Sequence, residues 1–130
     1  MARPSSEHPT EAELRILKVL WHESPKTVDE VRQSLADDDR ELTHSSVITL
    51  MNIMVRKGYL KREKRGRAFE FTPLIEAQSV GRNLLGDLVE RVFDGSAHSV
   101  MLELLETHDI DSDEIKEIRK LINRIAKEQS

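Results

Sequence analysis

The sequence contains no cysteine. This absence excludes disulfide bonds, zinc sites built on thiolates, cysteine nucleophiles and iron–sulfur clusters. The five glycines are scattered, so there is no phosphate-binding loop, dinucleotide fingerprint or Gly-x-Ser-x-Gly motif. The five histidines never take the i, i+4 spacing of a helical metal pair. We therefore expect a protein that binds no metal or other cofactor and is not an enzyme.

Long hydrophobic runs are missing as well. The longest apolar stretch, residues 47–55, is interrupted by Thr49 and Asn52 and is far too short to span a bilayer. The first nine residues lack the apolar segment of a signal peptide. We expect a cytoplasmic protein without membrane insertion.

The acidic excess is small and unevenly distributed. The chain has 20 basic and 24 acidic residues, a formal net charge of −4. Residues 56–67 nevertheless hold seven basic residues and one acidic residue, Glu63. A solvated face usually interleaves the two signs. The cluster therefore indicates a surface for a polyanion, whereas residues 77–130, with 7 basic and 11 acidic residues, carry the negative charge.

The first half of the chain predicts three helices and a hairpin. A Thr-x-x-Glu capping box occurs at residues 10–13 and again at 27–30, and each one predicts a helix start. A third helix is predicted from residue 43 or 44 to Gly58. Its inward positions are Val47, Leu50, Met51 and Met54.

The period then changes from helical to alternating. Residues 59–64 and 67–72 read as two short strands around an Arg65-Gly66 turn, with Phe69 and Phe71 on one face. Three helices followed by a basic hairpin is the order of a winged helix-turn-helix, whose third helix enters the major groove. We therefore predict a winged-helix DNA-binding domain over residues 1–75.

The face of the third helix that the core leaves free suits base reading. Asn52 can bond bidentately to adenine, Ser45 and Thr49 can donate or accept, and Ile48 can contact a thymine methyl group. Basic side chains at the hairpin would bind phosphates. The predicted DNA-binding residues are Ser45, Ile48, Thr49, Asn52, Arg56, Lys64, Arg65 and Arg67.

Residues 76–130 predict helices whose apolar faces exceed what so short a segment can cover by itself. A two-fold partner that presents the same faces would bury them. We predict a helical dimerisation domain over residues 76–130. Its predicted contact residues are Leu84, Leu88, Val92, Met101, Leu104, Ile115, Ile118, Ile122 and Ile125.

The order of several motifs resembles the penicillinase-repressor and methicillin-resistance-repressor family of winged-helix transcriptional regulators. These motifs are Thr10-Glu11-Ala12-Glu13-Leu14, Val19-Leu20-Trp21, Thr27-Val28-Asp29-Glu30-Val31, Ser46-Val47-Ile48-Thr49-Leu50-Met51, Lys57-Gly58-Tyr59-Leu60, residues 65–73, Phe93-Asp94-Gly95-Ser96 and Asp111-Ser112-Asp113-Glu114-Ile115. The resemblance implies a homodimeric bacterial repressor that binds a palindromic operator. It also implies release from DNA by proteolysis through a membrane metalloprotease sensor.

Three features depart from the family pattern. Leu42 stands where the family usually has Trp, and Ser45, Ile48 and Ile53 stand where it often has Lys or Arg. Glu103-Leu104 stands where it commonly has a cleavable Asn-Phe bond. The predicted fold is mostly α with a small β-hairpin, a winged helix-turn-helix domain followed by the helical domain. The alternative function is a winged-helix module that binds another protein and no DNA, and salt-dependent DNA binding separates the two.

Overall fold

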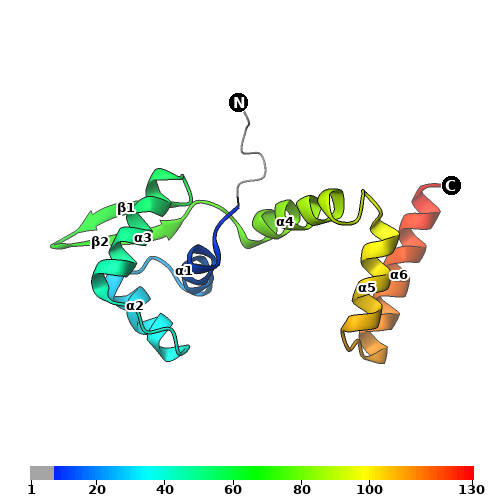
Figure 1. Ribbon diagram of the computed structural model, residues 1–130, viewed down its shortest axis with the longest axis horizontal. Coiled ribbons are helices and arrows are strands. Elements are labelled where there is room, and N and C mark those ends of the chain that lie inside the picture. The colour runs from blue at the N-terminus through cyan, green and yellow to red at the C-terminus, as the bar shows by residue number, and fades with distance from the viewer. Residues whose placement is uncertain (1–7) are drawn as a thin grey trace. The chain divides into compact units, whose positions relative to one another are not determined.

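The computed structural model describes residues 8–130. Residues 1–7, and with them most of the segment searched for a signal peptide, lie outside the described residues. The described residues form six helices and one antiparallel hairpin (Figure 1). In chain order they are α1 (Glu11–His22), α2 (Val28–Asp37), α3 (His44–Arg56), β1 (Leu60–Arg65), β2 (Ala68–Pro73), α4 (Ala77–Arg91), α5 (Ala97–Thr107) and α6 (Ser112–Glu128). The predicted fold class is confirmed.

The chain divides into two compact units, one that ends at Asp87 and one that spans Leu88–Ser130. The division falls inside the C-terminal part of α4. The boundary between residues 75 and 76 was expected from the end of the hairpin, and it stays a prediction. We call the two parts the N-terminal unit and the C-terminal unit.

Both predicted capping boxes are present in the N-terminal unit. The Thr10 hydroxyl accepts from the Glu13 amide at 3.2 Å, and the Glu13 carboxylate accepts from the Thr10 amide at 2.8 Å. Thr27 and Glu30 repeat the arrangement at 3.2 and 2.9 Å. Each box satisfies two amides that the first helical turn leaves without partners, which fixes where α1 and α2 begin.

One hydrophobic core holds α1, α2, α3 and the base of the hairpin together. Among its members, Val47, Met51 and Met54 were predicted from α3 and are fully buried, while Leu50 is half-buried. Phe71 joins the core, but Phe69 is 42% exposed because it lies closer to the hairpin tip. The buried cluster is Ile16, Leu17, Leu20, Val28, Val31, Leu35, Val47, Met51, Met54, Leu60 and Phe71.

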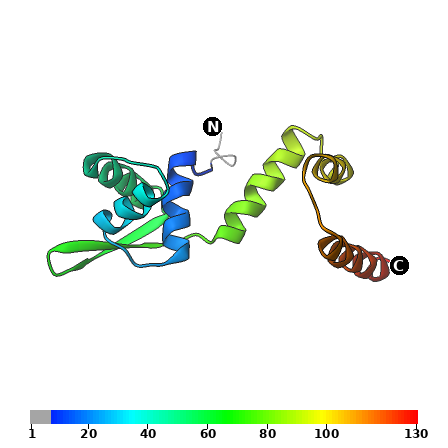
Figure 2. The same cartoon turned by 90° about the horizontal axis from the view of Figure 1, so that it is seen from below.

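The hairpin is attached to the helices through backbone hydrogen bonds. The Lys26 amide donates to the Phe71 carbonyl at 3.2 Å, and the Phe71 amide donates to the Lys26 carbonyl at 2.8 Å. The α1–α2 connection thus pairs with β2 like a short third strand. In both views the hairpin tip extends beyond the three helices (Figures 1 and 2).

The predicted hairpin turn is wrong by one residue. Arg65 pairs with Ala68, so the two loop residues are Gly66 and Arg67, not Arg65 and Gly66. Gly66 has φ +63°, a left-handed conformation that glycine adopts without steric cost. With this register Arg62 lies opposite Phe71 and Lys64 opposite Phe69.

A buried carboxylate connects the first and third helices. Glu13 is 1% exposed. One of its oxygens belongs to the α1 capping box, and the other accepts from the Lys57 ammonium at 2.8 Å. Lys57 follows directly after α3, and its ammonium lies 5.7 Å from the centroid of the Tyr59 ring. Glu13 therefore fixes the start of α1 and the end of α3 relative to each other.

The C-terminal unit has almost no core. Its helices α5 and α6 begin at the N-caps Ser96 and Asp111 and lie side by side (Figures 1 and 2). Among residues 88–130, all of which the structure describes, Val100 is the one buried hydrophobic side chain. Ten of its large apolar side chains are exposed, from 39% at Ile115 to 63% at Val92. An open apolar groove of about 260 Å³ runs between α5 and α6.

Replacing the buried carboxylate by an amide tests its role in stability. Glu13→Gln keeps the side-chain shape but removes the charge that faces Lys57. We expect the free energy of unfolding to fall by about 1.5–3 kcal/mol, the value of a hydrogen bond to a charged group. Glu30→Gln changes the same position of the exposed capping box and is expected to cost less than about 1 kcal/mol. Urea denaturation of both variants measures the difference, and equal losses would contradict the coupling of α1 to α3.

Candidate nucleic-acid interface

The outer face of α3 carries the predicted base-reading residues. Because Val47, Met51 and Met54 are buried, the side chains at helical spacing on the opposite side point away from the core. Ser45, Thr49 and Arg56 are exposed, and Asn52 is half-buried. Ile48 packs against the edge of the core, so only part of its side chain is available to a ligand.

A groove of about 400 Å³ separates α3 from the hairpin and brings several predicted residues together. Ile48 and Asn52 contribute from α3, and Arg67 contributes from the hairpin turn. Ser45 and Thr49 line a neighbouring open hollow on α3. The groove is lined by Thr27, Val28, Asp29, His44, Ile48, Asn52, Arg62, Arg67, Ala68, Phe69 and Phe71. A ligand in this groove would contact helix and hairpin at once.

The groove also carries one carboxylate. Asp29, in the first turn of α2, lies 3.7 Å from Arg32 Nε and 3.7 Å from His44 Nε2. The Arg32 guanidinium offsets the charge of the Asp29 carboxylate. The favourable electrostatic potential for a phosphate therefore comes from the basic hairpin and not from α2.

The hairpin presents its basic side chains to solvent. Lys61, Lys64 and Arg67 are exposed, and so is Arg65, whose Nε lies 3.6 Å from Glu70 Oε1. An exposed ion pair at this distance is weak and can be replaced by a phosphate. The structure thus places Lys64, Arg65 and Arg67 where a nucleic-acid backbone can reach them, and their contact with DNA stays a prediction.

Sequence reasoning missed Arg62, which joins the hairpin to α3. Its Nη1 donates to Asn52 Oδ1 at 2.6 Å, and its guanidinium lies 4.9 Å from the centroid of the Phe69 ring. The alternation of the strand was the available signal, because directly opposed residues share one face of a hairpin. Both the predicted and the observed register put Arg62 on the face of Phe69, but the contact with Asn52 depends on how the hairpin packs against α3, which no local pattern gives.

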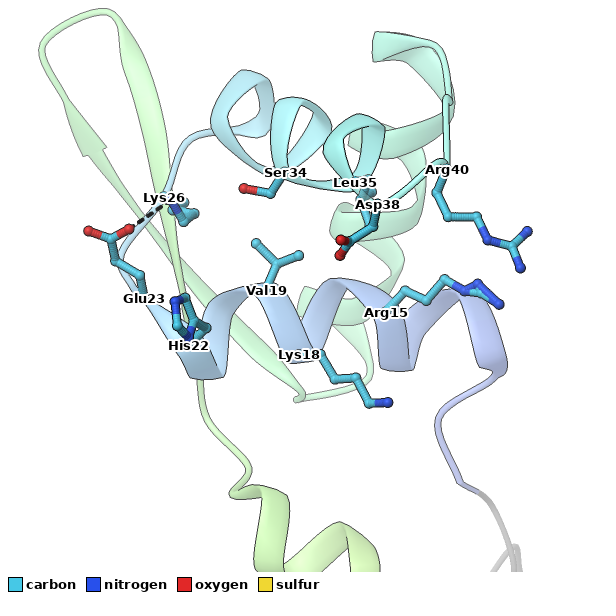
Figure 3. Close-up of a pocket in the computed structure, with 10 residues that line it drawn as sticks. All are labelled: Arg15, Lys18, Val19, His22, Glu23, Lys26, Ser34, Leu35, Asp38 and Arg40. Atoms are coloured by element: carbon cyan, nitrogen blue, oxygen red, sulfur yellow. Dashed lines mark hydrogen bonds and ion pairs between the residues drawn. The ribbon is translucent and has the colours of Figure 1, made fainter.

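A second groove lies between α1 and α2 (Figure 3). It has a volume of about 480 Å³ and contains no residue from α3 or the hairpin. Figure 3 shows Arg15 and Arg40 at one end of the groove and Lys26 with Glu23 at the other. Lys26 Nζ is 3.2 Å from Glu23 Oε1, and Arg15 Nη2 is 2.8 Å from Glu11 Oε2. Its charges are therefore partly compensated, and it is separate from the predicted DNA-binding residues.

Two searches of the described part of the chain concern other classes of site. Over residues 8–130, no three histidine, aspartate or glutamate side chains are grouped so that they could hold a metal ion. None of the helices described in this range is both long and apolar enough to cross a membrane.

The sequence profile of the penicillinase repressor family matches residues 9–124. The chain belongs to this family. The methicillin resistance regulatory protein MecI of Mammaliicoccus sciuri is 22% identical over 113 residues, which are 87% of this chain and 91% of that protein. The penicillinase repressor of Bacillus licheniformis is 26% identical over 113 residues, with 87% and 88% covered. The solution structure of the DNA-binding domain of the repressor BlaI is 30% identical, covers 55% of this chain and 88% of that domain, and gives a TM-score of 0.48.

Membership of the penicillinase repressor family confirms the resemblance that the motifs predicted. The family consists of transcriptional repressors, which are DNA-binding regulators and not enzymes. Three helices and a hairpin around one core make the N-terminal unit the winged-helix part of this family member.

Removing the two arginines around the turn tests the hairpin. Arg65→Ala combined with Arg67→Ala should weaken binding similarly on all DNA sequences. The slope of log affinity against log salt should flatten by about one unit per lost phosphate contact. Lys116→Ala with Lys120→Ala removes the same charge from α6 and should leave the slope unchanged. Fluorescence anisotropy over a salt series measures it, and an unchanged slope in the hairpin variant would remove the hairpin from the interface.

Proposed function

We propose that this chain represses transcription as a homodimer that binds a palindromic operator. One observation carries the proposal, namely that α3 presents a polar outer face beside a basic hairpin in a member of the penicillinase repressor family. Both elements rest on the same core, so helix and hairpin would dock on DNA as one body.

In this arrangement the two elements have different tasks. Ser45, Thr49 and Asn52 would read base edges in the major groove. Arg56 and the hairpin residues Lys64, Arg65 and Arg67 would bind phosphates, fix the register and supply affinity that depends on salt. The net negative charge of residues 77–130 keeps that part of the chain away from DNA.

The apolar surface of the C-terminal unit argues for a second copy as its partner. A unit with one buried hydrophobic residue does not have enough core to be stable by itself. Homo-oligomers with two-fold symmetry present the same faces to each other, so the exposed side chains of α5 and α6 could bury one another. Eight of the nine predicted contact residues lie in this unit, and Leu84 belongs to the N-terminal unit.

Dimerisation would make operator binding strong. A two-fold dimer matches a palindromic site, and the second half-site then binds intramolecularly with a gain of roughly 10²–10⁴. Any event that separates the two copies would release the repressor without change to α3. Cleavage within the C-terminal unit, as through a membrane metalloprotease sensor, is one such event. Glu103 and Leu104, where the family commonly has its cleavable bond, lie within α5 of this unit.

Charges placed in the apolar groove test the dimer. Leu104→Glu combined with Ile122→Glu should give a monomer in sedimentation and lower operator affinity by roughly 10²–10⁴. The control, Lys116→Gln with Lys127→Gln, makes the same change in net charge on the opposite side of α6 and should stay dimeric.

Operator fragments from the chain's own upstream region provide the second measurement. A monomeric variant that binds as tightly as the parent would contradict the dimer. If the parent binds no DNA in a salt-dependent way, the chain is instead a winged-helix module for a protein partner.

A further inference from the structure

We propose that Arg62 determines which base Asn52 reads. The structure assigns the Asn52 oxygen to Arg62, which leaves the amide NH₂ group of Asn52 for the major groove. Of the two purines, guanine offers only acceptors in the major groove and would then be favoured over adenine at this position. The inference rests on the proposed DNA-binding function.

The orientation of the Asn52 amide follows from the chemistry of its partner. A guanidinium carries five N–H donors and no acceptor, so it can bind only the oxygen end of an amide. The contact is short, 2.6 Å between Arg62 Nη1 and Asn52 Oδ1, as expected for a charged donor. The NH₂ group of Asn52 therefore points away from Arg62.

Arg62 is itself held in place from the other side. Its guanidinium lies 4.9 Å from the centroid of the Phe69 ring, within the range of a cation–π interaction. Phe69 is a hairpin residue with little core contact, and this contact gives its exposed ring a partner. Asn52, Arg62 and Phe69 thus form a chain of contacts from α3 to β2 along the groove.

The major-groove edges of the bases distinguish the two orientations of an asparagine. An amide with both ends available pairs with adenine, because the oxygen accepts from N6 and the NH₂ group donates to N7. Guanine offers two acceptors, N7 and O6, and no donor in the major groove. An amide that presents only its NH₂ group finds one acceptor, N7, beside the N6 donor at adenine, but two acceptors at guanine.

The test starts from the base pair that Asn52 contacts. Selection on randomised DNA with the parent and with Asn52→Ala identifies it as the position at which the preference disappears. At that position the parent should bind guanine about 3- to 10-fold more tightly than adenine, the range of one hydrogen bond. Arg62→Met keeps an unbranched apolar side chain next to Phe69 but has no donor. It should abolish this preference or reverse it toward adenine.

Lys64→Met is the matched control. Lys64 lies two residues along the same strand, on the same face, and the variant loses the same charge. It should lower overall affinity and the salt slope as much as Arg62→Met does, but keep the guanine preference. Thermal unfolding of each variant monitors the fold, and because Arg62 and Lys64 are both exposed we expect similar transitions.

The possible results separate the inference from the proposed function. An adenine preference in the parent, or a guanine preference that survives Arg62→Met, would overturn the role of Arg62 while DNA binding stands. If no position loses its preference in Asn52→Ala but a guanine preference is lost in Arg62→Met, the inference is also overturned, because Arg62 would then read the base itself. If no protein binds DNA with salt dependence, the proposed function fails.

Discussion

The burial of one face of α3 is the constraint on which the N-terminal unit depends. Val47, Met51 and Met54 fill the space between α1, α2 and the base of the hairpin, and they leave no freedom in the rotation of the helix. Because these apolar side chains occupy the buried face of α3, its polar side chains lie on the outward face. The same packing brings Asn52 next to the hairpin, where Arg62 reaches it.

Polar contacts at the rim of the core then fix the positions of its parts. Glu13 joins the first turn of α1 to Lys57 at the end of α3, and the Lys26–Phe71 pair joins the hairpin to the α1–α2 connection. Both contacts lie at element ends, where backbone groups lack helical partners. A hairpin held in this way stays beside α3 before any DNA is present, which lowers the cost of ordering it on binding.

The two units differ in how they reach stability. The N-terminal unit buries a continuous cluster from five elements, whereas the C-terminal unit buries Val100 and exposes most of its large apolar side chains. A domain that cannot cover its own apolar surface depends on another molecule. In the proposed repressor this difference has a functional meaning, because the recognition surface can stay intact while the assembly comes apart.

Local patterns in the sequence predicted most features that depend on neighbours along the chain, although they placed the hairpin turn one residue too early. The capping boxes at Thr10 and Thr27 place two helix starts, apolar spacing identifies the buried face of α3, and charge clustering marks the hairpin. The family follows from the order of such local motifs. Tertiary structure decided the features that depend on residues distant in sequence. Glu13 and Lys57 are 44 positions apart and Asn52 and Arg62 are 10 apart, and no local pattern relates them. The position of Arg62 next to Asn52 depends on how the hairpin packs against α3, so only the packed fold shows which side chain of the hairpin meets the recognition helix.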